Sequence, residues 1–341
     1  MTGFSFKVLR RLADGEFHSG TALARALGVS RGTVWNAVRA LESAGLAVYK
    51  VRGRGYRLRA GMSLLERAVI ARHTGAPASR FDIEIVEETE STSSSLLQRA
   101  AAGAGAGTVI AAEWQTKGRG RFGRPWHAEL GGALTFSLLW RFERGAGALA
   151  GLSLAAGVAL IRALKGLGAA EVDLKWPNDV VRRGEKLAGM LIEMQGDALG
   201  PSAAVIGIGL NVRLSEAARK LVGQPVADLE TACGRALDRN EVLGSMLGEL
   251  AHVLDLFSVE GFAPLRAEWE RYHAYQHQPI EVILPGGRTE RGLARGVADD
   301  GALLFETASG VRRLHSGEVS VRAAPRSQAA ALGAAAARGL A

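Results

Sequence analysis

Residues 118–126 read Gly-Arg-Gly-Arg-Phe-Gly-Arg-Pro-Trp and closely follow an apolar run that is typical of a strand. Glycine lets a backbone approach a ligand closely and adopt positive φ angles. Arginine carries a permanent charge and a fork of donors that matches phosphate or carboxylate. Because ordering such a loop costs conformational entropy, we expect an anionic ligand to order it, with a solvated basic loop as the alternative.

The loop also fits the G-x-G-x-x-G pattern of dinucleotide-binding folds through Gly118, Gly120 and Gly123. Its context argues against that fold. The glycines do not open an apolar helix, Pro125 and Trp126 follow at once, and no acidic residue ends a second strand at the expected distance. The sequence also lacks a G-x-x-x-x-G-K-S/T motif, which excludes a P-loop.

Length and composition describe a globular protein with more than one domain. The chain has 341 residues, of which 48% are hydrophobic, enough for two or three domains with buried cores. Its single cysteine, Cys233, excludes an internal disulfide framework and suits the reducing cytoplasm, where we place the protein. Lys7, Arg10 and Arg11 interrupt the apolar start, so we expect no signal peptide. No apolar run looks long enough to span a bilayer, so we expect no membrane partner.

Positive charge is concentrated in the first part of the chain. Residues 1–59 contain eleven Lys and Arg against three Asp and Glu, a net charge of +8 that equals the value for the whole chain. The remaining residues balance at 31 of each sign. A compact basic module attached to a neutral body indicates a nucleic-acid partner for that module alone.

Apolar spacing and turn residues in this module predict three helices and a hairpin. A first amphipathic helix covers residues 4–12, and two further helices, 20–27 and 31–44, begin after the N-cap residues Ser19 and Ser30. The hairpin that follows makes the module a winged helix-turn-helix, with a small protein-interaction domain as the alternative. We expect DNA contacts from the outer face of the third helix and the tip of the hairpin, at Arg31, Thr33, Asn36, Arg39, Arg52 and Arg54.

Two polar clusters follow in the middle of the chain. The hydroxyl-rich run 91–95 opens a predicted helix, where hydroxyls and free N–H groups can hold a carbonyl or an anion, or simply cap the helix. Farther on, Pro177 fixes a turn that projects Asn178 and Asp179. An aspartate at a strand end is a reasonable Mg²⁺ ligand, although such a turn is also common structural chemistry.

Two more polar side chains belong to predicted apolar strands. Lys186 enters such a strand and therefore needs a negative partner. A ligand phosphate or carboxylate would serve, and an exposed position on an edge strand is the alternative. Asn211 ends another apolar strand, in which Gly207 and Gly209 permit the close approach of a second group. The Asn211 amide can bond a ligand or cap the turn.

Five motifs, taken together and in this order, resemble one family. They are Ser91-Thr92, the loop 118–126, Lys175-Trp176-Pro177-Asn178-Asp179, Lys186-Leu187-Ala188-Gly189 and Gly207-Ile208-Gly209-Leu210-Asn211. The set is similar to bacterial biotin–protein ligases. With the helix-turn-helix, it resembles the bifunctional form that also represses biotin synthesis. The resemblance covers residues 5–322. Each motif is weak alone, and the ordered set is specific.

The resemblance implies an α+β protein of several domains. It predicts a winged helix-turn-helix at 1–60 and a mixed-sheet α/β ligase domain, similar to class II synthetases, at 61–277. An SH3-like β-barrel would follow at 278–323, where five short strands are expected. The Ala- and Gly-rich tail at 324–341 is expected to be disordered.

The resemblance also assigns roles to residues of this chain. Biotin contacts would come from Ser91, Thr92, Ser93, Gln115, Gly118, Arg119, Gly120, Arg121, Lys186 and Gly189. Nucleotide contacts would come from Arg119, Arg121, Trp126, Asn178, Lys186, Asn211 and Arg322. Lys186, Arg121 and Asp179 would be catalytic, with Asp179 as the Mg²⁺ ligand. Two positions depart from the family pattern, which usually has Asn at 93 and often a basic residue at 122.

The expected activity joins biotin to a lysine of a biotin carboxyl carrier protein, of acetyl-CoA carboxylase or a related enzyme. It proceeds through biotinyl-5′-AMP and uses ATP and Mg²⁺. Operator DNA and a second copy of the chain, in a homodimer favoured by the adenylate, would be further partners. A biotin-sensing repressor without ligase activity and a lipoate or other acyl–protein ligase are the alternatives.

Overall fold

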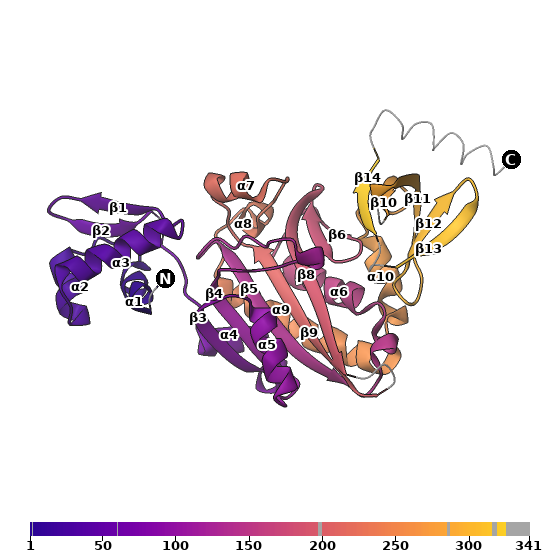
Figure 1. Ribbon diagram of the computed structural model, residues 1–341, viewed down its shortest axis with the longest axis horizontal. Helices are drawn as coiled ribbons and strands as arrows, with labels where there is room; N and C mark the ends of the chain where they lie inside the picture. The colour runs from indigo at the N-terminus through magenta and orange to yellow at the C-terminus, as the bar shows by residue number, and fades with distance from the viewer. Residues whose placement is uncertain (2, 60, 197–199, 285–286, 316–318, 325–341) are drawn as a thin grey trace.

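The computed structural model describes residues 1–324 except 2, 60, 197–199, 285–286 and 316–318. Three lobes follow one another along the long axis of the molecule. They are an N-terminal helical lobe, a central lobe built on a large sheet, and a C-terminal lobe of short strands (Figure 1). The tail 324–341, expected to be disordered, lies outside the described residues apart from Ala324.

The N-terminal lobe contains the helices and the hairpin that the sequence predicts: α1 (Gly3–Leu12), α2 (Gly20–Leu27), α3 (Arg31–Ser43), β1 (Val48–Val51) and β2 (Gly55–Leu58). The predicted caps form. The Ser19 hydroxyl accepts a hydrogen bond from the Ala22 amide at 3.0 Å, and the Ser30 hydroxyl accepts one from the Thr33 amide at 3.1 Å. Gly28 ends α2 with a φ of 67°, a conformation that turns the chain toward α3.

The central lobe contains a seven-stranded sheet. Its strands, in spatial order, are β3 (Asp82–Thr89), β4 (Thr108–Gln115), β5 (Ala133–Phe142), β9 (Ser202–Asn211), β8 (Glu185–Gly196), β7 (Asp179–Arg182) and β6 (Val172–Lys175). Strands β3 and β4 pair in parallel, and the other neighbours pair antiparallel. The predicted mixed sheet is therefore confirmed.

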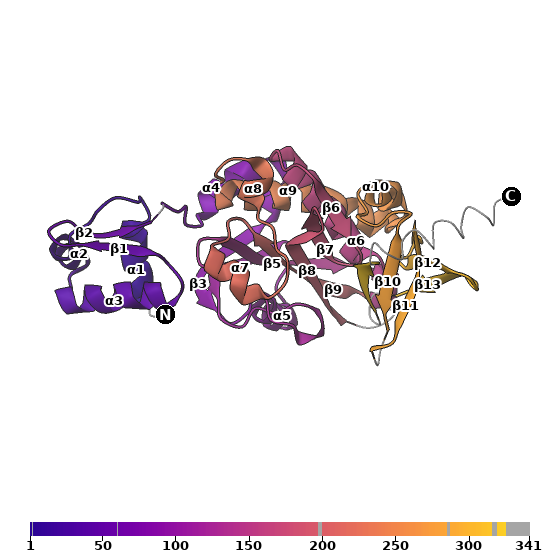
Figure 2. The same ribbon diagram turned by 90° about the horizontal axis from the view of Figure 1, so that it is seen from above.

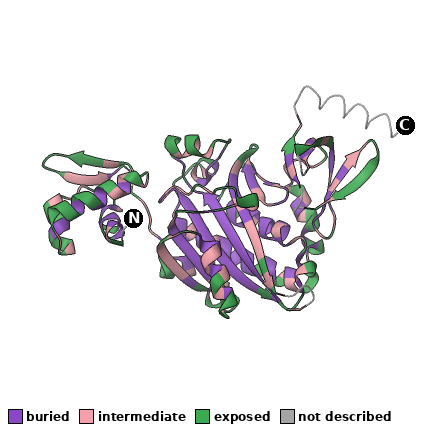
Figure 3. Cartoon of the chain, in the orientation of Figure 1, coloured by how far each residue is buried: buried purple, intermediate pink, exposed green. Residues whose placement is uncertain are grey.

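Helices cover both faces of this sheet. Helix α5 (Thr92–Ala101) packs on one face, and α4 (Arg67–Thr74), α6 (Leu152–Gly166) and α9 (Arg239–Glu260) cover the other (Figure 2). Strands β4, β5 and β9 are buried along most of their length (Figure 3). Polar side chains at the ends of these strands are consequently held on a rigid support.

Two core segments form longer apolar runs than we predicted from the sequence. Ala146–Gly166 and Arg239–Glu260 are long and apolar enough to cross a membrane by length and composition. The most apolar stretches of the two are 67% and 61% buried inside the molecule, where α6 and α9 belong to the main hydrophobic core. The expectation that no run is long enough was wrong, and packing assigns both segments to the core.

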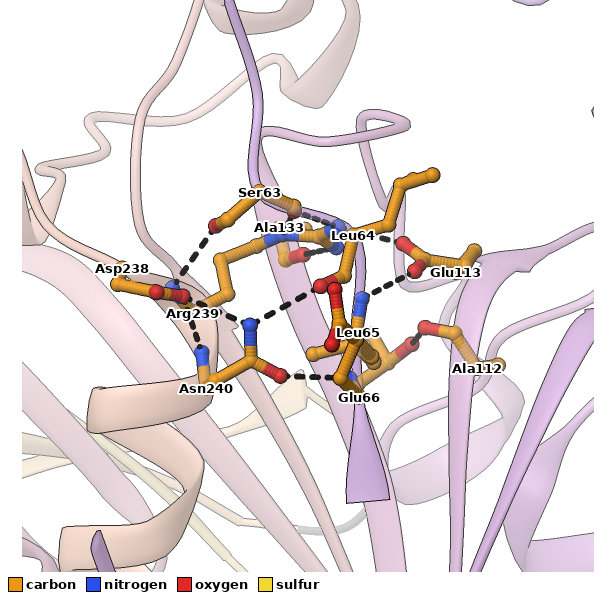
Figure 4. A network of polar contacts seen from close by, with 11 residues as sticks. Ser63, Leu64, Leu65, Glu66, Ala112, Glu113, Ala133, Asp238, Arg239 and Asn240 are labelled. Carbon is orange, nitrogen blue, oxygen red and sulfur yellow. Dashed lines mark hydrogen bonds and ion pairs between the residues drawn. The ribbon is translucent and has the colours of Figure 1, made fainter. Parts of the chain in front are cut away.

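A buried polar network anchors the segment that leads from the first lobe into the second (Figure 4). Arg239, at the start of α9, forms an ion pair with Glu113 of β4, and their side chains are only 2% and 3% exposed. Arg239 also donates to the carbonyl oxygens of Ser63 and Ala133, at 2.7 and 3.2 Å. Glu113 accepts from the Leu65 amide at 2.6 Å. The network joins four segments of the chain, around Ser63, Glu113, Ala133 and Arg239.

The same network explains why α4 begins only at Arg67. The Glu66 amide donates to the Asn240 side-chain oxygen at 2.7 Å, and the Leu64 carbonyl accepts from the Asn240 side-chain nitrogen at 2.9 Å. These bonds to α9 replace the helical pattern before Arg67.

Two short helices follow α9: η4 (Ala263–Leu265) and α10 (Arg266–Arg271). Beyond them the chain pairs with β6, because the Leu174 amide donates to the Tyr272 carbonyl at 2.7 Å and the Ala274 amide donates to the Leu174 carbonyl at 2.8 Å. Two short helices after β9 were not predicted: α7 (Glu216–Val222) and α8 (Leu229–Cys233).

The C-terminal lobe is a five-stranded antiparallel sheet. Its strands, in spatial order, are β13 (Gly310–Leu314), β12 (Leu303–Thr307), β11 (Thr289–Val297), β10 (Pro279–Ile283) and β14 (Ser320–Ala323). The Trp176 indole N–H donates to the Gly301 carbonyl at 3.0 Å. This bond fastens the C-terminal sheet beside the turn that carries Asn178 and Asp179.

Candidate active site

A cavity of about 530 Å³ lies between the loop 118–126, the start of α5, strands of the central sheet and β14 of the C-terminal sheet. The residues expected to contact biotin, to contact the nucleotide or to act in catalysis all line this cavity, with the exception of Gly118. Gly118 instead pairs with Trp126, whose amide donates to its carbonyl at 2.8 Å. A Cβ on Gly118 would lie 2.8 Å from the Trp126 carbonyl oxygen, so this glycine shapes the loop.

Hydroxyl groups at the start of α5 form one wall of the cavity. Ser91 caps the helix, and the Thr92 amide donates to the Gln115 side-chain oxygen at 2.7 Å. The hydroxyls of Thr92 and Ser93 bond to the hydroxyl of Ser137 on β5, at 2.8 and 3.0 Å. The run therefore caps the helix and also presents an organised polar surface. Ser137 was missed, because its signal is a single hydroxyl inside an apolar strand.

The loop 118–126 folds back on itself. The Gly120 amide donates to the Arg124 carbonyl at 2.7 Å, and Arg119 forms a β-bridge with Pro125. Phe122 at its tip has a φ of 57° and is 61% exposed. The left-handed conformation is uncommon for a residue with a side chain, so the tip is conformationally strained.

Two arginines of this loop reach across the cavity. Arg119 forms an ion pair with Glu193 of β8 at 2.8 Å, and Arg121 donates to the Asn178 side-chain oxygen at 3.2 Å. Burial lowers the pKa of Arg121, because the charged guanidinium loses contact with water, and the nearby Asp179 opposes this effect. The loop is thereby connected to the turn at the end of β6.

Trp126 lies directly against the glycine-containing strand β9. A Cβ on Gly209 would lie 2.4 Å from Cε2 of the Trp126 ring, so only glycine leaves room for the indole there. The Lys186 ammonium lies 5.7 Å from the centre of the same ring. The flat ring is thus held inside the cavity, where it can stack on a planar group.

Lys186 lies on β8, between β9 and β7, which contradicts the alternative of an edge strand. Its ammonium forms an ion pair with Asp179 at 2.8 Å, and the two side chains are 25% and 19% exposed. A Cβ on Gly189 would lie 3.1 Å from the Lys186 ammonium. Asp179 is therefore the negative partner that Lys186 was predicted to need.

The two asparagines of the predicted site mainly hold backbone. The Asn178 side-chain nitrogen donates to the Met190 carbonyl at 2.7 Å. That of Asn211 donates to the carbonyls of Lys186 and Ala227, at 3.3 and 3.1 Å. Both residues line the cavity, but these bonds commit their donor groups to the fold.

Positive charge exceeds negative charge around the cavity. Asp179 is the one carboxylate among the described lining residues, and the cationic side chains are Arg119, Arg121, Arg124, Lys175, Lys186 and Arg322. Burial lowers the pKa of Lys175; the nearby Asp179 carboxylate opposes this effect, and the cations Lys186, Arg322 and Arg124 add to it. Lys175 forms no ion pair with any carboxylate in the described part of the chain. The cavity is therefore suited to a polyanion.

The six residues expected to contact DNA are all exposed. The Thr33 hydroxyl bonds to the Ser30 hydroxyl at 2.9 Å, so it also belongs to the cap of α3. The Arg39 guanidinium lies 4.9 Å from the centre of the Trp35 ring, and that of Arg54 lies 4.1 Å from the centre of the Phe17 ring.

Three family models match different parts of the chain. Residues 85–211 match the biotin/lipoate A/B protein ligase family, residues 5–57 match an HTH domain, and residues 278–322 match the biotin protein ligase C terminal domain. Their order agrees with that of the three lobes.

Known proteins are similar over most of the chain. The bifunctional ligase/repressor BirA of Escherichia coli K12 is 35% identical, with 93% of this chain and 97% of that protein covered. The biotin–[acetyl-CoA-carboxylase] ligase of Mycobacterium tuberculosis is 35% identical over 74% of this chain and 94% of its own. A biotin protein ligase from Aquifex aeolicus, solved with biotin and ATP, is 30% identical, with a TM-score of 0.62 over 71% of this chain and 99% of its own. The chain belongs to the biotin protein ligase family, in the bifunctional ligase and repressor form that carries an N-terminal helix-turn-helix domain.

Proposed function

We propose that this protein is an ATP-dependent biotin–protein ligase and a biotin-responsive transcriptional repressor. The ligase would form biotinyl-5′-AMP and transfer biotin to a lysine of a biotin carboxyl carrier protein. One observation carries the proposal: organised hydroxyl groups and six cationic side chains line the same cavity. The relatives named bifunctional ligase/repressor, and the similar structure with biotin and ATP, support it.

The polar wall of the cavity suits the ureido ring of biotin, which both donates and accepts hydrogen bonds. Ser91, Thr92 and Ser93 bring hydroxyls to this wall. Because the Gln115 oxygen accepts from the Thr92 amide, the Gln115 side-chain nitrogen is left to donate to the ligand. The bonds to Ser137 hold the hydroxyls of Thr92 and Ser93 in place before biotin binds.

The first reaction forms the adenylate. The carboxylate of biotin attacks the α-phosphorus of ATP, the bond from that phosphorus to the bridging oxygen breaks, and pyrophosphate leaves. Charge shifts onto phosphoryl oxygens, so the protein acts mainly by positioning and neutralisation. Lys186 would contact the biotin carboxylate and the α-phosphate, and Arg121 would contact the phosphate from the loop; both side chains line the cavity.

The residues present also fit Mg²⁺. No group of three or more His, Cys, Asp or Glu side chains that could hold a metal occurs within the described residues. Mg²⁺ in nucleotide sites is commonly held by one or two carboxylates together with substrate phosphates, and Asp179 offers one carboxylate. When bound, Mg²⁺ would neutralise charge on the phosphates.

The loop 118–126 would close over the adenylate, with Trp126 stacked on the adenine. An acyl-adenylate is a mixed anhydride that water hydrolyses, so a closed loop that excludes water protects it. In the second reaction the neutral amine of the acceptor lysine attacks the acyl carbon and AMP leaves. Asp179 would accept the proton from that amine.

Replacing Lys175 with methionine is expected to slow adenylate formation by about 10- to 100-fold, because one cation facing the polyphosphate is lost. Transfer from added biotinyl-5′-AMP to a carrier domain should stay within about threefold of wild type, because the polyphosphate has already left. Lys7, exposed on α1, provides the matched Lys7→Met control. Equal slowing of both half-reactions would show that Lys175 does not act on the polyphosphate.

Replacing Gly209 with alanine is expected to raise the KM for ATP by about tenfold, because the new methyl group displaces Trp126 and base stacking on an aromatic ring is worth ~1–3 kcal/mol. Biotin affinity, measured by isothermal titration calorimetry without ATP, should change little. Gly166→Ala is the matched control, since its Cβ would meet no atom within 4 Å. An unchanged KM for ATP would contradict the stacking role of Trp126.

We propose that the chain is divided into three domains: a winged helix-turn-helix at 1–60, a ligase domain at 61–277 and an SH3-like barrel at 278–323. The hairpin β1–β2 and the five antiparallel strands at the C-terminus support these assignments.

As a repressor, the protein would work in the cytoplasm and bind operator DNA as a homodimer favoured by bound adenylate. Sedimentation with and without biotin and ATP tests the dimer, and a DNA gel shift unaffected by both ligands would defeat the coupling.

Competition between substrates separates the ligase from its alternatives. A biotin ligase should form its adenylate with biotin and be little inhibited by an equal concentration of lipoate. Preference for lipoate would identify a lipoate ligase. Biotin binding without pyrophosphate release would identify a sensor that lacks ligase activity.

A further inference from the structure

The outer face of α3 carries a glycine that packing does not explain. Gly32 lies in the first turn of the helix, and a Cβ there would meet no atom nearer than the Ser30 hydroxyl oxygen, at 3.6 Å. Its φ is not positive, so its backbone conformation is open to any residue. Glycine is among the least favourable residues in a helix. Close approach of another molecule to the helix backbone is the remaining use for a glycine at this position.

The same face carries an exposed tryptophan. Trp35 is 45% exposed, and the guanidinium of Arg39, one helical turn further on, lies 4.9 Å from its ring centre. Positions 32, 35, 36 and 39 are spaced so that they form one continuous patch on a helix. The patch, which we call the α3 patch, therefore consists of Gly32, Trp35, Asn36 and Arg39.

Charge indicates which class of molecule the α3 patch contacts. Two of the three carboxylates in residues 1–59 are already paired, because Asp14 bonds to His18 at 2.8 Å and Glu42 pairs with Lys50 at 2.7 Å. Arg39 forms no ion pair with a carboxylate in the described residues, and its guanidinium is held by the Trp35 ring. The patch presents fixed positive charge beside an apolar ring, which suits a polyanion that also offers apolar groups.

The proposed repressor function already gives α3, with Asn36 and Arg39, the role of contacting duplex DNA. Building on that function, we infer that Trp35 is a further specificity-determining residue, which contacts a thymine methyl group in the major groove. Because Gly32 carries no side chain, the helix backbone can lie close to the floor of the groove. The Asn36 amide matches the N6 and N7 positions of adenine. The thymine methyl is the apolar group that base edges offer in the major groove, and the Trp35 ring is the apolar group of the patch. Arg39 supplies the contact to phosphate or guanine.

The test removes the methyl group and the ring separately. The full-length protein, with biotin, ATP and Mg²⁺, first selects binding sites from a pool of duplex DNA with a randomised centre. Each thymine of a selected site is then replaced by uracil, which differs only by the missing methyl. At one thymine per half-site, uracil should weaken binding by about fourfold, the effect of burying one methyl-sized group. Trp35→Ala should abolish that difference, binding the thymine and uracil sites equally.

Arg39→Ala is the matched control on the same face. It should weaken binding to both sites equally and lower the dependence of affinity on salt by about one ion, while the thymine preference remains. Ligase activity and the thermal unfolding midpoint of Trp35→Ala should match wild type, since Trp35 is remote from the cavity and exposed.

Four outcomes would overturn the inference. Equal wild-type affinity for all thymine and uracil sites, or a thymine preference that persists in Trp35→Ala, would remove the methyl contact while leaving the repressor function intact. A Trp35→Ala protein that fails to dimerise in sedimentation would assign the ring to a protein contact. If no sequence is enriched from the pool, both the DNA-binding role and the inference fail.

Discussion

Lys186→Ala is expected to lower the rate of biotin-dependent pyrophosphate release by about 10²–10³-fold, the range seen when one preorganised charge-stabilising group is removed from an active site. The ammonium is fixed on an inner strand of the sheet, where it pairs with Asp179 and lies beside the Trp126 ring. The loss should appear mainly in kcat, because this contact strengthens as charge develops on the α-phosphate.

Two controls separate chemistry from folding in this variant. Lys7→Ala removes an exposed lysine on α1 and should release pyrophosphate at the wild-type rate. The Lys186→Ala protein should remain folded at the assay temperature, because removing the lysine side chain opens the Asp179 carboxylate to the cavity that both residues line, where water can reach it. The thermal unfolding midpoint checks this. A Lys186→Ala enzyme with wild-type kcat would contradict the role given to this residue.

Arg239→Met is expected to have the largest effect on stability, a loss of ~3–5 kcal/mol in the free energy of unfolding. It leaves the Glu113 carboxylate buried without its partner, and it also leaves the carbonyls of Ser63 and Ala133 without a donor. Urea unfolding followed by circular dichroism measures the change, with the slope of the transition checked for constancy.

A second pair and a double variant test the cause. Arg266 and Asp299 form an exposed ion pair at 2.9 Å, so Arg266→Met should cost at most ~1 kcal/mol. Replacing Glu113 by glutamine in the Arg239→Met background should restore part of the lost stability, because the unpaired buried charge is removed. A single Arg239→Met variant within 1 kcal/mol of wild type would show that the buried pair is not a main source of stability.

Local chemistry explains why much of this fold could be predicted from the sequence. The caps at Ser19 and Ser30 and the glycine turn at Gly28 involve residues within a few positions of one another, and the structure has all three. The requirement that Lys186 meet a negative partner also follows from the sequence, because an apolar strand cannot carry an unpaired charge cheaply. The identity of that partner, Asp179, depends on strand pairing and needed the structure.

Long-range contacts account for what could not be predicted. Arg239 and Glu113 are 126 residues apart, and nothing near either one signals the pair. The same separation hid the late start of α4, which is set by bonds to α9. Ser137 joined the site through bonds to Thr92 and Ser93, 45 and 44 residues away. Lys175 was visible within its motif, but its burial without an ion-pair partner was not.

Ligase activity itself can be measured by incubating the purified protein with biotin, ATP and Mg²⁺ and following both pyrophosphate release and the biotin label on a biotin carboxyl carrier domain. Pyrophosphate should be released only when biotin is present, and one biotin should become attached to the acceptor lysine of each carrier domain. Biotin binding with no pyrophosphate release and no labelled carrier would contradict the proposed ligase function.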